Sequence, residues 1–275
     1  MIVRAKLLFA LRVSGAFLRM DWLITRSYPM AFVVLQLQSL VPFVIYYFIA
    51  RLVGTHSPNV GGDYYTFVVL GMIGTQFITA GLLGLGSALV RAVQEGRFEM
   101  LLIEPVKWRL LPFTLIQWPI VLQAASSLVA VGAAALLGAH FRLAGLPAAL
   151  IVLALGTGAG VGISVLAASI RVLAKQGDPV LGLYVILAQI FSGVYFPVHS
   201  LPPLVRPIAV LLPNTYVIDS LRRLMMPNGA HLQGPTMHAS LIVLAMFNIA
   251  VFPLAIWLFG RSMQYGRKMG VLAGY

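Results

Sequence analysis

Side chains able to perform acid, base or metal chemistry are few in this chain, and they are scattered. It holds seven acidic residues, five histidines and no cysteine in 275 residues. The histidines lack the close spacing of a metal site, and no metal is expected: they stand at His56, His140, His199, His231 and His238. Without cysteine, disulfides and thiol catalysis are excluded.

Catalysis is not expected either, because it would need an acid–base pair or a nucleophile beside a base. Asp63 and Asp219, with nearby arginines, could contribute to such a site, but solvated loop charges are the simpler interpretation. The chain has no GxxxxGK[ST] phosphate-binding loop. Any ATP hydrolysis would therefore occur on another polypeptide.

The elements that position these residues are six stretches without Asp, Glu, Lys or Arg, each at least 24 residues long. A helix of roughly 20 apolar residues crosses about 30 Å of hydrocarbon. Only 9% of the residues are charged, whereas 60% are apolar. The sequence predicts an all-α integral membrane protein with one transmembrane domain, residues 1–275, and six spans: 29–52, 64–89, 113–138, 145–170, 179–196 and 239–260.

The lysines and arginines predict the orientation of these spans. Fourteen of the nineteen lie on one side if the N-terminus is cytoplasmic. The positive-inside rule then places both termini in the cytoplasm, and the expected location is a plasma membrane such as the bacterial cytoplasmic membrane. The net charge of +12 reflects this orientation and contact with anionic lipids. Nucleic acid is not an expected partner.

Residues 1–27 are predicted to form an amphipathic helix on the cytoplasmic membrane surface. Arg12, Arg19 and Arg26 recur every seven residues and share one face of this helix. Apolar residues occupy the opposite face, as in helices that lie in a membrane interface. A lipid-bound anchor and a contact with a cytoplasmic partner both fit, and they are compatible.

Polar residues inside the spans are neutral, which disfavours a proton-driven pump. Most are expected to form hydrogen bonds between helices, and a minority to line a pathway: Gln36, Gln38, Gln76, Gln117, Gln123, Thr157, Ser164, Gln189 and Asn248. The fourth span carries two overlapping GxxxG spacings, which predict close helix packing, at Gly156, Gly158, Gly160 and Gly162.

Two further segments carry a distinct pattern. The cytoplasmic segment 91–112 places charges around an apolar ridge of Phe98, Leu101 and Leu102 and reaches a helix-ending Pro105. It could bind a partner or rest among lipid headgroups. The outer segment 197–238 is rich in proline yet apolar, so short re-entrant helices buried in protein are expected there.

These two segments resemble motifs of the permease subunits of type-2 ATP-binding-cassette (ABC) exporters. The first motif comprises Glu95, Gly96, Arg97, Phe98, Glu99, Leu101, Leu102 and Pro105. The second motif runs from Phe191 to Arg222 and resembles the end of the family's fifth span and the outer segment that follows it. Its candidate gate residues are Gly193, Pro197, Pro202, Pro203, Pro213, Asn214, Tyr216 and Asp219. Within the first motif, Arg97 replaces the Thr- or Ser-like residue usual in the family.

The resemblance implies a membrane subunit of an ATP-driven exporter. The first motif would couple to a separate ATP-binding-cassette subunit that holds ATP and Mg, with no cofactor on this chain, and the second would form an outer gate. A second permease, the same chain or a sister chain, would complete the transport path.

The expected substrate is an amphiphilic drug- or lipid-like molecule, and a polysaccharide or glycolipid is the alternative. A non-transport membrane scaffold and an intramembrane enzyme that uses Asp63 or Asp219 are the alternatives from other classes.

Overall fold

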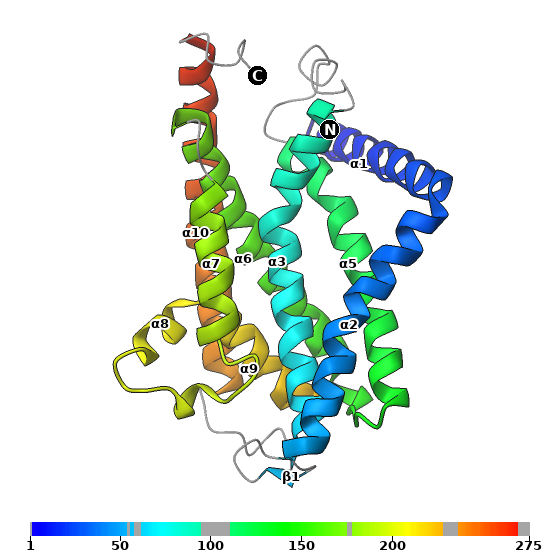
Figure 1. Ribbon diagram of the computed structural model, residues 1–275. Helices are drawn as coiled ribbons and strands as arrows, with labels where there is room; N and C mark the ends of the chain where they lie inside the picture. Colours follow the sequence, from blue (N-terminus) through cyan, green and yellow to red (C-terminus); the bar gives the residue numbers. More distant parts are fainter. Residues whose placement is uncertain are drawn as a thin grey trace.

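The computed structural model describes residues 2–53, 56–57, 62–94, 111–174, 178–227 and 236–268. Long helices dominate these residues, and most run roughly along one axis (Figure 1). The helices are α1 (Ile2–Ser27), α2 (Pro29–Val53), α3 (Tyr64–Gln94), α5 (Leu111–Leu136), α6 (Leu146–Ala174), α7 (Asp178–Phe191), α8 (Arg206–Leu211), α9 (Pro213–Met225) and α10 (Met237–Lys268). Two 3-10 helices, η2 (Leu143–Gly145) and η3 (Val198–Ser200), and a minimal antiparallel pair of strands, β1 (His56–Ser57) and β2 (Gly62–Asp63), lie between them.

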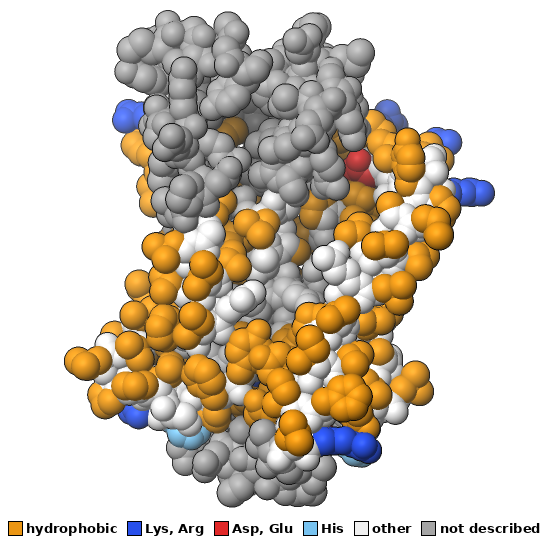
Figure 2. Space-filling view, in the orientation of Figure 1, with side chains coloured by type: hydrophobic (Ala, Val, Ile, Leu, Met, Phe, Trp, Pro, Cys, Tyr) orange, Lys and Arg blue, Asp and Glu red, His pale blue; other side chains and the backbone are white. Residues whose placement is uncertain are grey.

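Five described helical segments have the length and composition to cross a membrane: Pro29–Leu52, Tyr64–Gly84, Thr114–Leu136, Leu143–Ser169 and Met237–Ser262. They correspond to five of the six predicted spans. In Figure 2 apolar side chains cover the middle of the visible face, and the coloured lysine and arginine side chains lie toward its two ends. The chain is therefore a multi-pass membrane protein.

The span predicted at residues 179–196 is a shorter helix than expected. α7 is 14 residues long and ends at Phe191, whereas a straight span needs roughly 20 residues. The chain leaves the helix at Gly193, whose φ of +84° lies in the left-handed region that glycine adopts without steric cost. The helix therefore ends before residue 196, the predicted end of this span, although Val194, Tyr195 and Phe196 continue the apolar pattern beyond it.

The central helix of the bundle is α3. Of its apolar span, 78% is buried, compared with 6% for α2, because α3 packs against α5, α6 and α9. Its first turn is fixed by Asp63, whose carboxylate accepts hydrogen bonds from the backbone N–H groups of Tyr65 (3.2 Å) and Thr66 (3.1 Å). An acidic side chain at this position satisfies N–H groups that otherwise lack a partner. Asp63 thus acts as a helix cap in the structure.

Glycines of α6 lie where α6 meets α3 and α9. A Cβ at Gly156 would lie 2.7 Å from a methyl group of Val217 in α9, and a Cβ at Gly160 would overlap the carbonyl oxygen of Ile78 in α3. In the reverse direction, a Cβ at Gly81 of α3 would lie 2.5 Å from a carbonyl oxygen of α6. The backbones of α3 and α6 therefore approach closely, as small residues permit in membrane helices.

The alternate glycines of α6 face α10. A Cβ at Gly158 would collide with the side-chain amide of Asn248, and one at Gly162 would lie 2.9 Å from Val251. Asn248 also donates a hydrogen bond to the backbone carbonyl of Leu155 in α6 (3.0 Å). The four glycines thus lie on two sides of one helix, so that α6 is packed between α10 and the α3–α9 pair.

The described part of the outer segment 197–238 forms short helices, of which α9 packs into the bundle. It contains η3, α8 and α9, while residues 228–235 lie outside the described part. α9 contacts α3, α6 and α10, and it lies toward the same end of the bundle as β1 (Figure 1). Its buried side chains include Val217, Ile218 and Leu221. A helix packed in this way belongs to the core of the bundle.

Candidate functional site

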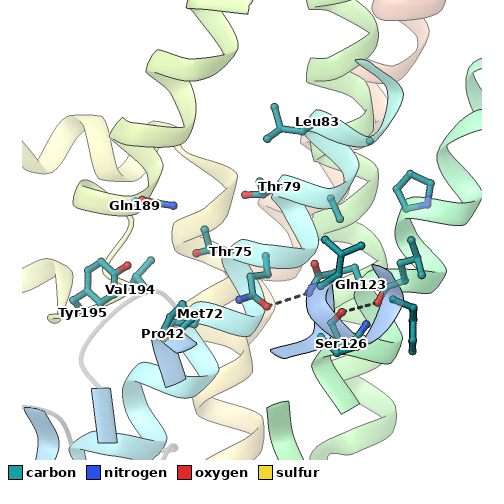
Figure 3. Close-up of a pocket in the computed structure, with 18 residues that line it drawn as sticks. Pro42, Met72, Thr75, Thr79, Leu83, Gln123, Ser126, Gln189, Val194 and Tyr195 are labelled. Atoms are coloured by element: carbon teal, nitrogen blue, oxygen red, sulfur yellow. Dashed lines mark hydrogen bonds between the residues drawn. The ribbon is translucent and has the colours of Figure 1, made fainter. Parts of the chain in front are cut away.

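A cavity of about 680 Å³ lies between α2, α3, α5 and the end of α7. Figure 3 shows side chains from these elements converging on it, with Leu83 toward one end and Tyr195, Val194 and Pro42 toward the other. None of the described residues that line it is charged. Its polar lining is neutral: Gln36, Thr75, Gln76, Thr79, Gln123, Ser126 and Gln189.

Part of this polar lining is already hydrogen-bonded. The Nε2 of Gln123 in α5 donates to the Oε1 of Gln76 in α3 (3.1 Å) and to the hydroxyl of Ser127 (3.1 Å). In contrast, the Oε1 of Gln36 and the hydroxyl of Thr75 are buried without a hydrogen-bond partner. A buried polar atom without a partner carries an energetic cost that a bound hydrogen-bonding group removes. The cavity therefore suits an uncharged molecule with apolar surface and a few polar groups.

Four of the polar span residues singled out from the sequence meet at this cavity: Gln36, Gln76, Gln123 and Gln189. Thr75 and Thr79 were missed, although both lie on the face of α3 that carries Gln76. Two of the other polar residues form hydrogen bonds elsewhere. Gln117 donates to the Ser14 hydroxyl of α1 (2.9 Å), and Thr157 donates to a carbonyl of its own helix.

Tyrosines close the cavity toward the end of the bundle that carries β1. The ring of Tyr195, in the turn after α7, stacks on the ring of Tyr46 in α2, with centroids 4.8 Å apart and planes 11° apart. The hydroxyl of Tyr64 in α3 donates a hydrogen bond to the backbone carbonyl of Tyr195 (3.2 Å). Three separate elements therefore meet at this end of the cavity.

Arg222 of α9 lies directly behind this turn. Its side chain is buried, and it donates from Nε to the carbonyl of Phe67 (3.0 Å), from Nη1 to that of Gly193 (2.8 Å) and from Nη2 to that of Val194 (2.8 Å). The guanidinium carbon also lies 3.3 Å from the centroid of the Phe67 ring. The second sequence motif ends at Arg222, but the role of this residue was not predicted. The available signal was its position on the apolar face of α9, one turn from Ile218 and Met225.

The neighbouring charges of α9 satisfy each other. Arg223 donates to the carboxylate of Asp219 at 2.8 Å, one helical turn away. Burial raises the pKa of the Asp219 carboxyl, and the bond to Arg223 opposes that rise. Asp219 is therefore engaged in an ion pair, as Asp63 is engaged in a helix cap.

The predicted outer-gate residues fall into two groups. Asn214 accepts a hydrogen bond from the hydroxyl of Tyr184 in α7 (2.7 Å), and Tyr216 donates to the backbone carbonyl of Val210 in α8 (2.9 Å). Together with Gly193, Pro213 and Asp219, they lie in the packed unit formed by α7, α8 and α9. Pro197 precedes η3 and is partly buried. Pro202 and Pro203 are exposed between η3 and α8.

The predicted coupling residues lie outside the described residues. They are Glu95, Gly96, Arg97, Phe98, Glu99, Leu101, Leu102 and Pro105, which follow the end of α3 at Gln94. At the same end of the bundle, α1 lies across the long helices (Figure 1) and contacts α5, where Trp22 meets Trp118 edge to face at 6.3 Å. Arg12, Arg19 and Arg26 are exposed on α1.

Among the described residues, no group of three or more histidine and acidic side chains is arranged to hold a metal ion. The family model described as "ABC-2 type transporter" matches residues 15–226, which is well over half of the chain. No curated protein matches the chain.

Proposed function

We propose that this chain, which belongs to the ABC-2 type transporter family and is the permease component of an ABC transporter, exports an uncharged amphiphilic substrate. The substrate would be drug-like or lipid-like and would leave the cytoplasm or the inner leaflet. The observation that carries this proposal is the neutral, partly polar cavity between α2, α3, α5 and α7. Energy would come from ATP and Mg bound to a separate ATP-binding subunit, as the family implies.

Six crossings of a plasma membrane are part of this proposal. α6 and α10 run toward the end of the bundle that carries α1, and α7 runs back from it (Figure 1). The start of α1 and the end of α10 both lie toward that end (Figure 1), which supports an even number of crossings. We infer that α7 and the packed segment after it make the fifth crossing, with both termini cytoplasmic. Non-helical backbone at that depth is tolerated where protein buries it.

A second permease would complete the transport path. The span of α2 is only 6% buried, and α2 forms one wall of the cavity. If a second copy or a sister permease faced this wall, the two cavities would form one central path. Lipid would cover the remaining exposed apolar surface.

Polysaccharide or glycolipid export is the alternative within the family. Sugar chains are commonly held by stacking on aromatic rings, but only Phe32 and Tyr195 are aromatic among the described residues that line the cavity. The remaining lining is mostly aliphatic and amide in character. This composition favours an amphiphile over a sugar polymer.

The proposal is tested by isolating the tagged chain from its own host in mild detergent. We expect an ATP-binding-cassette subunit to co-purify, with vanadate-sensitive ATPase activity that uncharged amphiphiles stimulate. A preparation that reproducibly contains no ATPase would contradict the transport assignment. It would favour the membrane scaffold or the intramembrane enzyme, and full activity after Asp63→Asn and Asp219→Asn would argue against the enzyme.

Filling the cavity should block transport without disturbing assembly. Thr79→Trp places an indole ring in the cavity, and an overpacking cost of about 1–3 kcal/mol corresponds to about five- to 150-fold weaker substrate binding. The measurement is ATP-dependent movement of NBD-labelled diacylglycerol in proteoliposomes that hold the permease and its ATPase.

Leu128→Trp is the matched control, because Leu128 is 75% exposed on α5 and does not line the cavity. We expect this variant to transport the probe as the natural chain does. Equal transport by both tryptophan variants would argue against the cavity as part of the path.

A further inference from the structure

The turn that follows α7 is held from behind by one side chain. The guanidinium of Arg222 donates two of its hydrogen bonds to consecutive carbonyls of this turn, Gly193 and Val194, and a third to Phe67 in α3. The planar guanidinium presents its donors in a rigid fork, so that three bonds can form from one group at the same time. The turn is therefore fixed to both α9 and α3 through a single residue.

Gly71 provides the space for this arrangement. A Cβ at this position would lie 2.6 Å from the Nη2 of Arg222 and 2.7 Å from the carbonyl oxygen of Val194. Any residue larger than glycine at position 71 would therefore displace both the guanidinium and the turn. The missing side chain of Gly71 thus leaves the space that the Arg222 guanidinium and the Val194 carbonyl occupy.

The opposite side of the same turn forms a wall of the cavity. Val194 and Tyr195 line it, and Tyr195 stacks on Tyr46 of α2. The side of the turn that faces the cavity is thus held mainly by ring stacking and by the single hydrogen bond from Tyr64. α2 is the least buried of the five candidate spans. The contact between Tyr195 and Tyr46 of α2 should therefore separate more easily than the contact between the turn and Arg222.

We propose that Arg222 is a positioning residue for substrate release, which holds the segment 192–196 as the closed wall of an outer gate against Tyr46. The gate opens when the turn leaves Nη1 and Nη2 together, pivoting at Gly193, while α9 stays in the core. This inference rests on the proposed function, because it assigns the end of the cavity near β1 to the outer side of the membrane. The contacts of Arg222 with the turn, and of Tyr195 with Tyr46, are the same whatever the substrate is.

The charge of Arg222 suits such a role. Its described hydrogen bonds all go to backbone carbonyls, and Asp219, its nearest acidic neighbour on α9, is bonded to Arg223. A cation stabilised by carbonyl dipoles and by the Phe67 ring stays bound to those carbonyls, because among the described residues its hydrogen bonds go to carbonyls and not to a carboxylate. A lysine would keep the charge but could not form the fork.

The absence of cysteine from the natural chain allows a direct test by thiol labelling. A single probe, Thr75→Cys, is placed in the cavity one turn from Gly71, where the native side chain is 6% exposed. A membrane-impermeant maleimide is added to intact cells, with and without Arg222→Lys. We expect labelling of the probe to accelerate about tenfold or more in Arg222→Lys, because lost charge-assisted hydrogen bonds shift the opening equilibrium by that order.

Two further single-cysteine probes separate the possible results. Leu204→Cys, at a position that is 91% exposed between η3 and α8, reports outer accessibility, and Ala159→Cys, at a position that is 1% exposed in α6, reports loosening of the whole bundle. We expect neither probe to change with Arg222→Lys. Gly71→Ala, which disturbs the contact without altering charge, should accelerate labelling of Thr75→Cys in the same direction.

Unchanged labelling of Thr75→Cys in both variants would overturn the proposal. A parallel increase at Ala159→Cys would also overturn it, because Arg222 would then support the whole bundle rather than the gate. If Leu204→Cys reacts only in inside-out vesicles, the proposed orientation is wrong. Labelling of Thr75→Cys with and without Arg222→Lys is then compared in inside-out vesicles, and a faster reaction in Arg222→Lys there still supports the role of Arg222.

Discussion

Glu99→Lys is expected to give a permease that inserts and purifies normally but no longer drives ATP-dependent transport. Glu99 belongs to the proposed coupling segment, which follows α3 directly and by family resemblance would sit in a groove of the ATPase. Reversing its charge places a like or unpaired charge at that contact, and a buried unpaired charge costs about 3–5 kcal/mol. We therefore expect a loss of coupled activity of at least about a hundredfold.

The measurement is substrate-stimulated ATP hydrolysis by the reconstituted complex, together with the amount of ATPase that co-purifies. Arg51→Glu is the matched control, because it also reverses one charge and shifts the net charge by two units, in the opposite direction. Arg51 is exposed in the last turn of α2, far in sequence from the coupling segment. Phe98→Ala combined with Leu102→Ala should also release the ATPase, through loss of apolar contact. Normal stimulated hydrolysis in Glu99→Lys would remove this segment from the coupling contact.

Gly160→Val is expected to prevent the chain from accumulating as a folded protein. A Cβ at Gly160 would overlap the carbonyl oxygen of Ile78, and a β-branched side chain adds two further methyl groups at the same place. Helix backbones cannot shift as a flexible side chain can, so the cost should lie at or above the upper end of the usual overpacking range, about 3 kcal/mol. That amount is a large fraction of the stability of a typical domain.

Gly132→Val in α5 is the matched control, because a Cβ there would have no atom within 4 Å. The two variants are compared by their yield of monodisperse protein in gel filtration and by the midpoint of thermal unfolding in detergent. We expect Gly132→Val to resemble the natural chain. If Gly160→Val is equally stable, the close crossing of α3 and α6 is not a determinant of the fold.

Hydropathy and charge alone placed most of the helices correctly. Residues 29–52 were predicted and α2 is Pro29–Val53; residues 64 onward were predicted and α3 begins at Tyr64. These patterns are informative in this chain because the charge-free stretches are long and the segments between them carry arginine or proline. It failed at the end of α7, where the backbone conformation of Gly193 rather than apolar character ends the helix.

The candidate site was only partly predictable, because it depends on which helices pack together. Gln36, Gln76, Gln123 and Gln189 were recognised as polar residues in apolar spans, but which helices face each other is a matter of tertiary packing. The role of Arg222 was not predicted, because its partners are backbone carbonyls that are distant in sequence. Such a contact leaves no pattern in side-chain types.

The continuity of α3 has a mechanical consequence. Its 31 residues form a helix about 46 Å long, and unlike α2, α5 and α10 it contains no proline. A helix without an internal proline keeps its backbone hydrogen bonds throughout and has no proline kink. One end of α3 leads into the proposed coupling segment, while Phe67 and Gly71 near the other end contact Arg222. A displacement of α3 by the ATPase would therefore reach the contact with Arg222 through one uninterrupted helix.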